Sequence, residues 1–202
     1  MSDDRPRSPR RESMRARALV GLAELPTIVA VGPFSDLGHA EQLGAAFIAV
    51  LRSCTTQLVL LGTGAHRGAV VRQAADCSVQ SRVHLVADLV EHRRSMLLAA
   101  ADVVVPSPAS GTGMLLDLMA VGRAVAAPAI PAAARLIVPT GAGLFCWPGG
   151  VSAMTAAILR LLSAPMLRDE MATRAGQVTE RQDLCRAKRR HFNTVSKGNE
   201  HA

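Results

Sequence analysis

Aromatic side chains are scarce in this chain of 202 residues: they make up 2% of the sequence, and tyrosine is absent. Proteins that bind single-stranded nucleic acid stack the bases on aromatic rings, so this composition argues against that class. The net charge of +7 would suit an anionic partner, but the basic residues crowd the two ends of the chain. Such runs are typical of solvated tails, and we do not expect nucleic acid as a partner.

Closely spaced cysteines are also missing. Cys54, Cys77, Cys146 and Cys185 lie far apart and form no CxxC pair, which argues against a zinc knuckle and a redox dithiol. Buried thiols in a reducing cytosol are the plain interpretation of this pattern. We predict neither a bound metal nor another cofactor.

Long hydrophobic runs are the third absence. The apolar stretch after the basic start, ALVGLAEL at 18–25, is short and contains Glu24, so it does not resemble a secretory signal. The longest candidate for a membrane span is interrupted by Asp102, Pro106 and Pro108. We therefore expect a cytoplasmic protein without a membrane span.

Hydrophobic residues nevertheless make up 49% of the chain, which is ample for a buried core. The length favours one domain, and changes in composition place it at residues 26–182. Residues 1–25 are rich in Arg, Pro and Ser and are predicted to form a disordered basic arm. Residues 183–202 are predicted to be a basic, polar tail.

Short apolar runs alternate with segments of helical spacing along this domain. The predicted strands are 27–32, 57–62, 82–88, 102–107, 123–129 and 143–147. The predicted helices are 40–52, 66–76, a segment ending near 101, 112–122, 152–164 and 166–182. This alternation predicts an α/β fold, a doubly wound parallel sheet of Rossmann type with about six strands and helices on both faces.

Three glycine-containing loops, at 32–39, 62–67 and 106–114, should lie at the carboxyl edge of this sheet, where such folds bind ligands. Glycine lets a backbone approach a phosphate, and the helix that follows offers unpaired N–H groups. Tight strand-to-helix turns need glycine as well, so both explanations stay open. The loops lack GxxxxGK[ST] and a full GxGxxG after the first strand, which argues against a P-loop and an ordinary NAD site.

One carboxylate, Asp117, stands inside the helix predicted over 112–122. Its neighbours are apolar: Met114, Leu115, Leu116, Leu118 and Met119. A carboxylate near the start of a helix at the ligand-binding edge can accept hydrogen bonds from both hydroxyls of a ribose. Alternatively, Asp117 lies on the solvent-exposed side of the helix and binds no ligand.

The ordered set of motifs resembles the C-terminal, nucleotide-sugar-binding domain of family-4 glycosyltransferases, which have the GT-B fold. The resemblance covers about residues 27–180. Its motifs are AVGPFSDLGHAEQLGAAF, LVLLGTG, RVHLVADL, LLAAADVVVPSPASGTGMLLDLMAVGRAVAA, GAGLFCWPGG and LLSAPMLRDEMATRA. The family segment LEAMA-G-PV is matched by LDLMAVGRAV. The resemblance implies that this chain is one half of a GT-B fold.

The resemblance also implies roles for single positions. The second of the family's paired glutamates binds the ribose hydroxyls and falls on Asp117, whereas the first, which holds the donor sugar, falls on Ala109. The segment that contacts the sugar and the diphosphate matches Ser110, Gly111, Thr112, Gly113 and Met114. The segment that contacts the base falls near Asp88. Gly32 allows the backbone of the first loop to approach the donor closely.

The first loop departs from the family, whose arginine and lysine clamp the diphosphate there. Here Pro33 follows the glycine, the family's lysine is either replaced by Leu37 or deleted, and no lysine precedes Lys188. Charge-assisted hydrogen bonds contribute about 1.5–3 kcal/mol each, so their loss predicts donor binding weaker by ~10²- to 10⁴-fold. His39 and Arg67 are nearby candidates for binding the diphosphate. Alternatively, His39 caps a helix and Arg67 is a charged surface residue.

The family also has an acceptor-binding domain, which we do not expect residues 1–26 to form because they are too few. We predict a glycosyltransferase-like donor domain for metal-independent hexosyl transfer from a nucleotide-diphosphate sugar, inactive unless a partner chain carries the acceptor half. One alternative is a non-catalytic module for protein interaction or nucleotide sensing, which would form homo-oligomers to cover its exposed face. The other is a truncated remnant that keeps the fold without activity.

Overall fold

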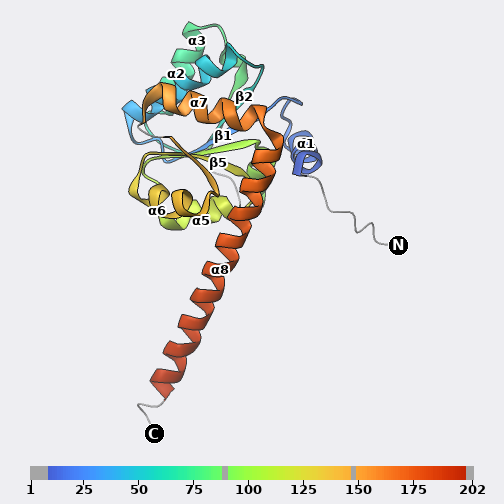
Figure 1. Ribbon diagram of the computed structural model, residues 1–202. Coiled ribbons are helices and arrows are strands. Elements are labelled where there is room, and N and C mark those ends of the chain that lie inside the picture. Colours follow the sequence, from blue (N-terminus) through green and yellow to red (C-terminus); the bar gives the residue numbers. More distant parts are fainter. Residues whose placement is uncertain (1–8, 88–90, 147–148, 199–202) are drawn as a thin grey trace, which may run out of the picture.

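A single parallel sheet forms the centre of the molecule (Figure 1). The computed structural model describes residues 9–87, 91–146 and 149–198. The strands are β1 (Thr27–Val31), β2 (Gln57–Leu61), β3 (Val83–Val86), β4 (Val103–Pro106), β5 (Ala124–Pro128) and β6 (Gly143–Cys146). Their order is β3-β2-β1-β4-β5-β6, and all the pairings are parallel. This order confirms the predicted doubly wound fold.

The central strands are buried on both sides, which explains their continuous apolar sequences. All five residues of β1 and of β2 are buried. Val29 in the middle of β1 pairs with Val59 on one side and with Val104 on the other. Successive residues of a strand point to opposite faces, so each strand contributes to two separate cores.

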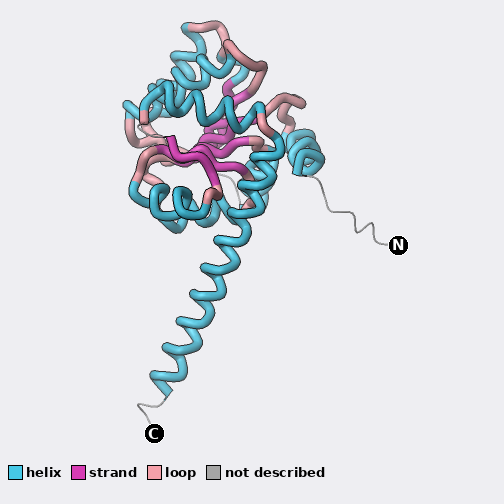
Figure 2. Tube along the Cα trace, in the orientation of Figure 1, coloured by secondary structure: helices cyan, strands magenta, loops and turns pink. Residues whose placement is uncertain are grey.

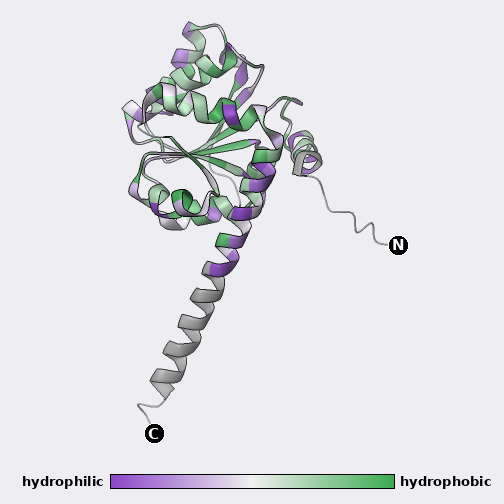
Figure 3. Cartoon of the chain, viewed as in Figure 1, coloured by the Kyte–Doolittle hydropathy of each residue, from purple (hydrophilic) through white to green (hydrophobic). Residues whose placement is uncertain are grey.

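Three helices cover each face of the sheet, and the strands lie between the two layers (Figure 2). One layer consists of α2 (Leu37–Leu51), α3 (Arg67–Asp76) and α7 (Gly150–Ser163). The other consists of α4 (Glu91–Ala100), α5 (Thr112–Ala120) and α6 (Pro131–Thr140). Hydrophobic residues gather on the strands and on the inner sides of the helices (Figure 3). A short 3₁₀ helix, Gln80–Arg82, precedes β3.

The last helix, α8 (Pro165–Gly198), is 34 residues long. Its first part packs along the side of the domain, where Met171 joins the core under α2 and α7 and Ala175 joins the core under α5 and α6. The backbone then continues as one helix that projects away from the sheet (Figure 1). The predicted end of this helix at residue 182 is therefore wrong, since the helix crosses into the segment predicted as a tail.

The prediction of a disordered arm over residues 1–25 is wrong for residues 9–20, which form α1 (Pro9–Val20). This helix packs against α4 and buries Ser13, Ala16 and Arg17. The Arg17 guanidinium forms an ion pair with Asp102, and its Nε donates a hydrogen bond to the carbonyl of Ala100 at 3.0 Å. The charge that suggested disorder is thus neutralised by a residue far away in the sequence.

Helix α6 was not predicted because its sequence, PAAARLIVPT, contains two prolines. Pro131 occupies the first turn, where a missing N–H costs no helical hydrogen bond. Pro139 lies inside the last turn, and the helix ends one residue after Thr140 at Gly141, which has a positive φ of 61°. Pro131 therefore sits where a helix tolerates proline best, whereas Pro139 removes one helical hydrogen bond close to the end of α6.

Within the described ranges, no single helix has the length and hydropathy of a membrane span. Helix α7 and the described part of α8 reach these values only together, and the chain bends by 101° between them. Met154, Ile158 and Leu161 of α7 are buried in the core of the domain.

Candidate functional site

The first and second glycine-containing loops pack directly against each other at the carboxyl edge of the sheet. The N–H of Phe34 donates to the carbonyl of Thr63 (2.9 Å), and the N–H of His66 donates to the carbonyl of Phe34 (3.0 Å). A Cβ atom on Gly64 would lie 2.5 Å from the backbone of Phe34, and one on Gly32 would lie 3.1 Å from the carbonyl oxygen of Thr63. Contact between the two loops therefore accounts for both glycines, so they are not by themselves evidence of a phosphate site.

A pocket of about 500 Å³ opens at this same edge, which is within the usual range for small-molecule sites. It lies beyond the ends of β5 and β6 and beside the first turns of α2, α6 and α7. Residues that line it include Asp36, His39, Gln42, Ile130, Gly149 and Gly150. The structure thus places His39, a predicted ligand-binding residue, in a real cavity.

His39 and Asp36 have separate roles in this pocket. Asp36 is the N-cap of α2, and its Oδ1 accepts a hydrogen bond from the backbone N–H of His39 at 2.7 Å, so Asp36, and not His39, provides the cap. The residue His39 is 7% exposed. Burial lowers the pKa of His39, against the opposing effect of Asp36. A neutral imidazole offers both a donor and an acceptor, which suits a hydroxyl-bearing ligand.

Two helix N-termini without side-chain caps meet the pocket. Their N-cap residues, Ile130 of α6 and Gly149 of α7, both line the cavity, and neither helix has a capping hydrogen bond from a side chain. The first N–H groups of a helix are left without partners inside the helix and carry partial positive charge. No lysine or arginine is found among the described residues around the cavity. Any anion held there would depend on backbone dipoles.

The predicted sugar and diphosphate segment lies at the start of α5, on the other face of the sheet. Gly111 is the N-cap, in extended conformation and without a side-chain capping bond, and Thr112 and Gly113 follow it as exposed residues of the first turn. Ser110 is 5% exposed, and its hydroxyl has no hydrogen-bond partner in the described structure. Met114 is half-buried and points toward α4.

Asp117 is exposed, whereas Leu115, Leu116, Leu118 and Met119 around it are buried. Asp117 does not line the 500 Å³ pocket. The structure therefore explains how an acid fits in an apolar helix: the side chain occupies the single outward position between buried neighbours. Its role in binding ribose stays a prediction. Asp88, the residue predicted near the base, lies outside the described residues.

Arg94 was missed in the sequence. It lies in the first turn of α4, and its Nη2 is 3.2 Å from the Sδ atom of Met114. Arg67, which was considered from the sequence, instead donates to the carbonyl of Gly62 at 3.1 Å, within the second loop. No local sequence signal separates these two arginines, because their roles depend on which helices meet.

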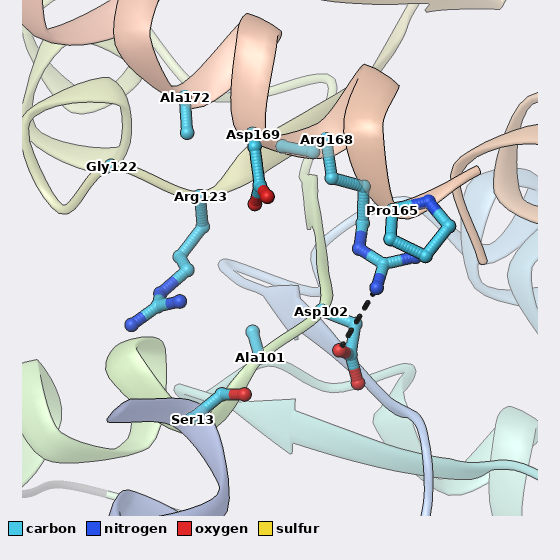
Figure 4. A pocket seen from close by; sticks show the side chains of 10 residues that line it. Ser13, Ala101, Asp102, Gly122, Arg123, Pro165, Arg168, Asp169 and Ala172 are labelled. Carbon is cyan, nitrogen blue, oxygen red and sulfur yellow. Dashed lines mark ion pairs between the residues drawn. The ribbon is translucent and has the colours of Figure 1, made fainter. Parts of the chain in front are cut away.

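A second, smaller pocket of about 120 Å³ lies at the opposite, amino edge of the sheet (Figure 4). Charged residues surround it: Asp102 and Arg123, which directly precede β4 and β5, and Arg168 and Asp169 of α8. Arg168 lies 3.7 Å from Asp102. Arg123, beside it, pairs with Glu12 of α1 at 3.2 Å. Burial lowers the pKa of Arg123, with Glu12 opposing the change. Asp102, Arg123 and Arg168 are thus all engaged in ion pairs, two of them with residues of α1. We therefore interpret this pocket as part of the docking site of α1, called the socket for α1 below.

Within the described part of the chain, no group of three or more His, Cys, Asp or Glu residues is placed to hold a metal ion. The fold is a doubly wound α/β domain, and its larger pocket lies at the carboxyl edge of the sheet, the edge at which folds of this class bind ligands. Comparison with known proteins identifies the family within this class.

The family described as Glycosyl transferases group 1 matches residues 25–164. The chain belongs to this family, which confirms the resemblance seen in its motifs. A search of curated proteins finds no match.

Solved structures of glycosyltransferases share the fold. Sucrose-phosphate synthase from Thermosynechococcus elongatus is 23% identical with a TM-score of 0.72, over 89% of this chain and 49% of that one. Anabaena Alr3699/HepE, solved in complex with UDP and glucose, is 17% identical with a TM-score of 0.73, over 93% of this chain and 52% of that one. This chain therefore spans about half the length of these two proteins.

The C-terminal domain of a glycosyl transferase group 1 family protein, LpcC from Francisella tularensis, matches along most of both chains. It is 18% identical with a TM-score of 0.73, over 83% of this chain and 91% of that domain. This match agrees with the prediction that the chain resembles the C-terminal half of a GT-B fold.

Proposed function

We propose that this domain binds a nucleotide-diphosphate sugar across the carboxyl edge of its sheet and serves as the donor half of a hexosyltransferase. The observation that carries the proposal is the 500 Å³ pocket at this edge, bordered by the uncapped N-termini of α6 and α7, in a chain of the group 1 glycosyl transferase family. The complex of Alr3699/HepE with UDP and glucose supports this choice of ligand.

Each part of the donor has a proposed place. The exposed carboxylate of Asp117 accepts hydrogen bonds from the ribose hydroxyls. The base is bound near Asp88, as the family resemblance implies. The backbone from Gly111 to Met114 receives the diphosphate, with Ser110 beside it, and the first loop at Gly32 closes the site. The sugar extends toward the pocket, where His39, as a neutral imidazole, hydrogen-bonds a hydroxyl.

Transfer of the sugar needs an acceptor site opposite this edge, because a site open to water cannot exclude hydrolysis. We propose that a second domain or a partner chain supplies it. The reaction would need no metal, since the uncapped helix N-termini at this edge neutralise part of the charge of the leaving diphosphate.

Ala109 favours a second candidate, nucleotide-sugar binding without transfer. It stands where the family has the glutamate that holds the donor sugar, and an alanine methyl cannot accept a hydrogen bond. Ser110 next to it offers one hydroxyl in place of the carboxylate. In this case the domain would act as a sensor or a docking module for its ligand.

Thermal unfolding of the purified chain with UDP-glucose, GDP-mannose or ADP-glucose tests the proposal. A ligand at a hundredfold excess over Kd stabilises a protein by about 2.7 kcal/mol, and the matching sugar nucleotide should raise Tm accordingly. The variant Asp117→Ala should lose most of this shift, whereas Asp76→Ala, which removes an acid at the end of α3, should keep it. The absence of a shift with all three nucleotides at millimolar concentration would refute donor binding.

A transfer assay separates the two candidates. Release of UDP or free glucose from UDP-glucose, with and without a protein that carries the acceptor domain, reports hexosyl transfer or hydrolysis. Binding without any release under both conditions would favour the sensor.

A further inference from the structure

The start of α5 has a cationic neighbour that the sequence does not reveal. Arg94 and Met114 are 20 residues apart, yet Nη2 of Arg94 lies 3.2 Å from Sδ of Met114. Met114 is the third residue of α5, and Arg94 is in the first turn of α4. The contact therefore places a guanidinium group beside the first turn of α5.

Among the side chains that the structure describes, which do not include those of residues 88–91, no carboxylate forms an ion pair with Arg94. Its partner is a thioether, which is a weak acceptor. The side chain is half-buried, so water compensates only part of its charge. Arginine in such a position favours an anion with oxygen atoms, above all a phosphate.

The first turn of α5 has two further features that suit an anionic ligand. The hydroxyl of Ser110, one residue before the N-cap, is buried and has no hydrogen-bond partner among the described atoms, which is uncommon for a buried polar group. Around Gly111 and Gly113, a Cβ atom would meet nothing within 4 Å. The turn thus combines an orphan hydroxyl, uncapped N–H groups and open space.

The first loop offers no cation of its own here. Pro33 and Phe34 are held by contacts with the second loop, and Leu37, near the position of the family's lysine, is an exposed apolar residue. Arg67 donates to a backbone carbonyl in the second loop. The charge that balances a diphosphate must come from another element.

We propose that Arg94 is the diphosphate-binding cation of this domain and replaces, from helix α4, the arginine and lysine that are missing from the first loop. On ligand binding the guanidinium exchanges the thioether of Met114 for phosphate oxygens at the start of α5. This inference rests on the proposed function, because it assumes a nucleotide-diphosphate ligand at this edge.

Titration of the full chain with UDP-glucose, UDP and inorganic pyrophosphate by calorimetry, and with uridine by ligand-observed NMR, tests the inference. Arg94→Met should weaken the binding of UDP and UDP-glucose about ten- to hundredfold, as expected for the loss of one charge-assisted contact, and should leave uridine unchanged. Arg94→Lys should recover part of the affinity. Arg93→Met is the matched control, because Arg93 is an exposed arginine on the same helix, and it should change Kd less than twofold.

Each outcome bears on one of the two proposals. Equal affinity of Arg94→Met and wild type for UDP would overturn the role of Arg94 and leave the proposed function standing. An equal loss for uridine and UDP would also overturn it, because the effect would then not depend on phosphate. If the wild type binds none of the four probes and shows no thermal shift with GDP-mannose or ADP-glucose, the proposed function itself fails. Far-UV circular dichroism checks the fold, and Arg94→Gln takes the place of Arg94→Met if that variant unfolds.

Discussion

Replacement of Gly64 by alanine should destabilise the domain through the contact between its first two loops. Gly64 has a φ of +146°, and a Cβ atom there would lie 2.5 Å from the N, C and O atoms of Phe34. The backbone conformation is unfavourable for a side chain and costs about 1–3 kcal/mol, and crowding against rigid backbone adds about 1–3 kcal/mol. We expect a loss of roughly 2–6 kcal/mol in the free energy of unfolding, a large share of the stability of a typical domain.

Urea denaturation monitored by far-UV circular dichroism measures this change as a lower midpoint with an unchanged slope. Gly176→Ala is the matched control, since Gly176 lies within α8 and nothing lies within 4 Å of an added Cβ. It should stabilise the protein by up to about 1 kcal/mol, because alanine favours a helix. A midpoint for Gly64→Ala equal to that of the wild type would refute the close packing of the two loops.

Two further predictions concern the pocket at the carboxyl edge. Burial lowers the pKa of His39 below its ordinary value of 6.5. The stability that the neutral imidazole contributes is therefore complete above pH 6.5 and is lost as the pH falls from 6.5 through the lowered pKa. His39→Gln should flatten the fall in unfolding free energy between pH 7 and 5, and an unchanged slope would contradict this. Burial raises the pKa of the Cys146 thiol to about 11, so a variant that keeps only this cysteine should react with iodoacetamide at pH 8 at least tenfold more slowly than one that keeps only the exposed Cys77, and similar rates would show that Cys146 is accessible.

The strands of the sheet could be predicted from the sequence because each one is marked by a pattern within a few consecutive residues. Each buried strand is a continuous apolar run, and Val29, Val59 and Val104 lie next to one another in neighbouring strands. The two helices that prediction missed depend on context. Arg17 makes α1 look like a solvated arm until it meets Asp102, and Pro139 makes α6 look like a loop.

The candidate site was predictable only in part. The motifs identified the family and the start of α5, and the structure places His39 in a pocket. The outward position of Asp117 follows from the packing of its four apolar neighbours, which composition alone does not order. The position of Arg94 cannot be predicted from the sequence, because its contact with Met114 depends on how α4 and α5 pack against each other.

The socket for α1 at the amino edge has a practical consequence for handling the protein. Glu12 and Arg17 anchor this helix beside Asp102 and Arg123, at the end of the sheet remote from the pocket. A label attached to α1 itself would therefore lie on the side of the sheet remote from the pocket and leave the carboxyl edge free to meet ligands.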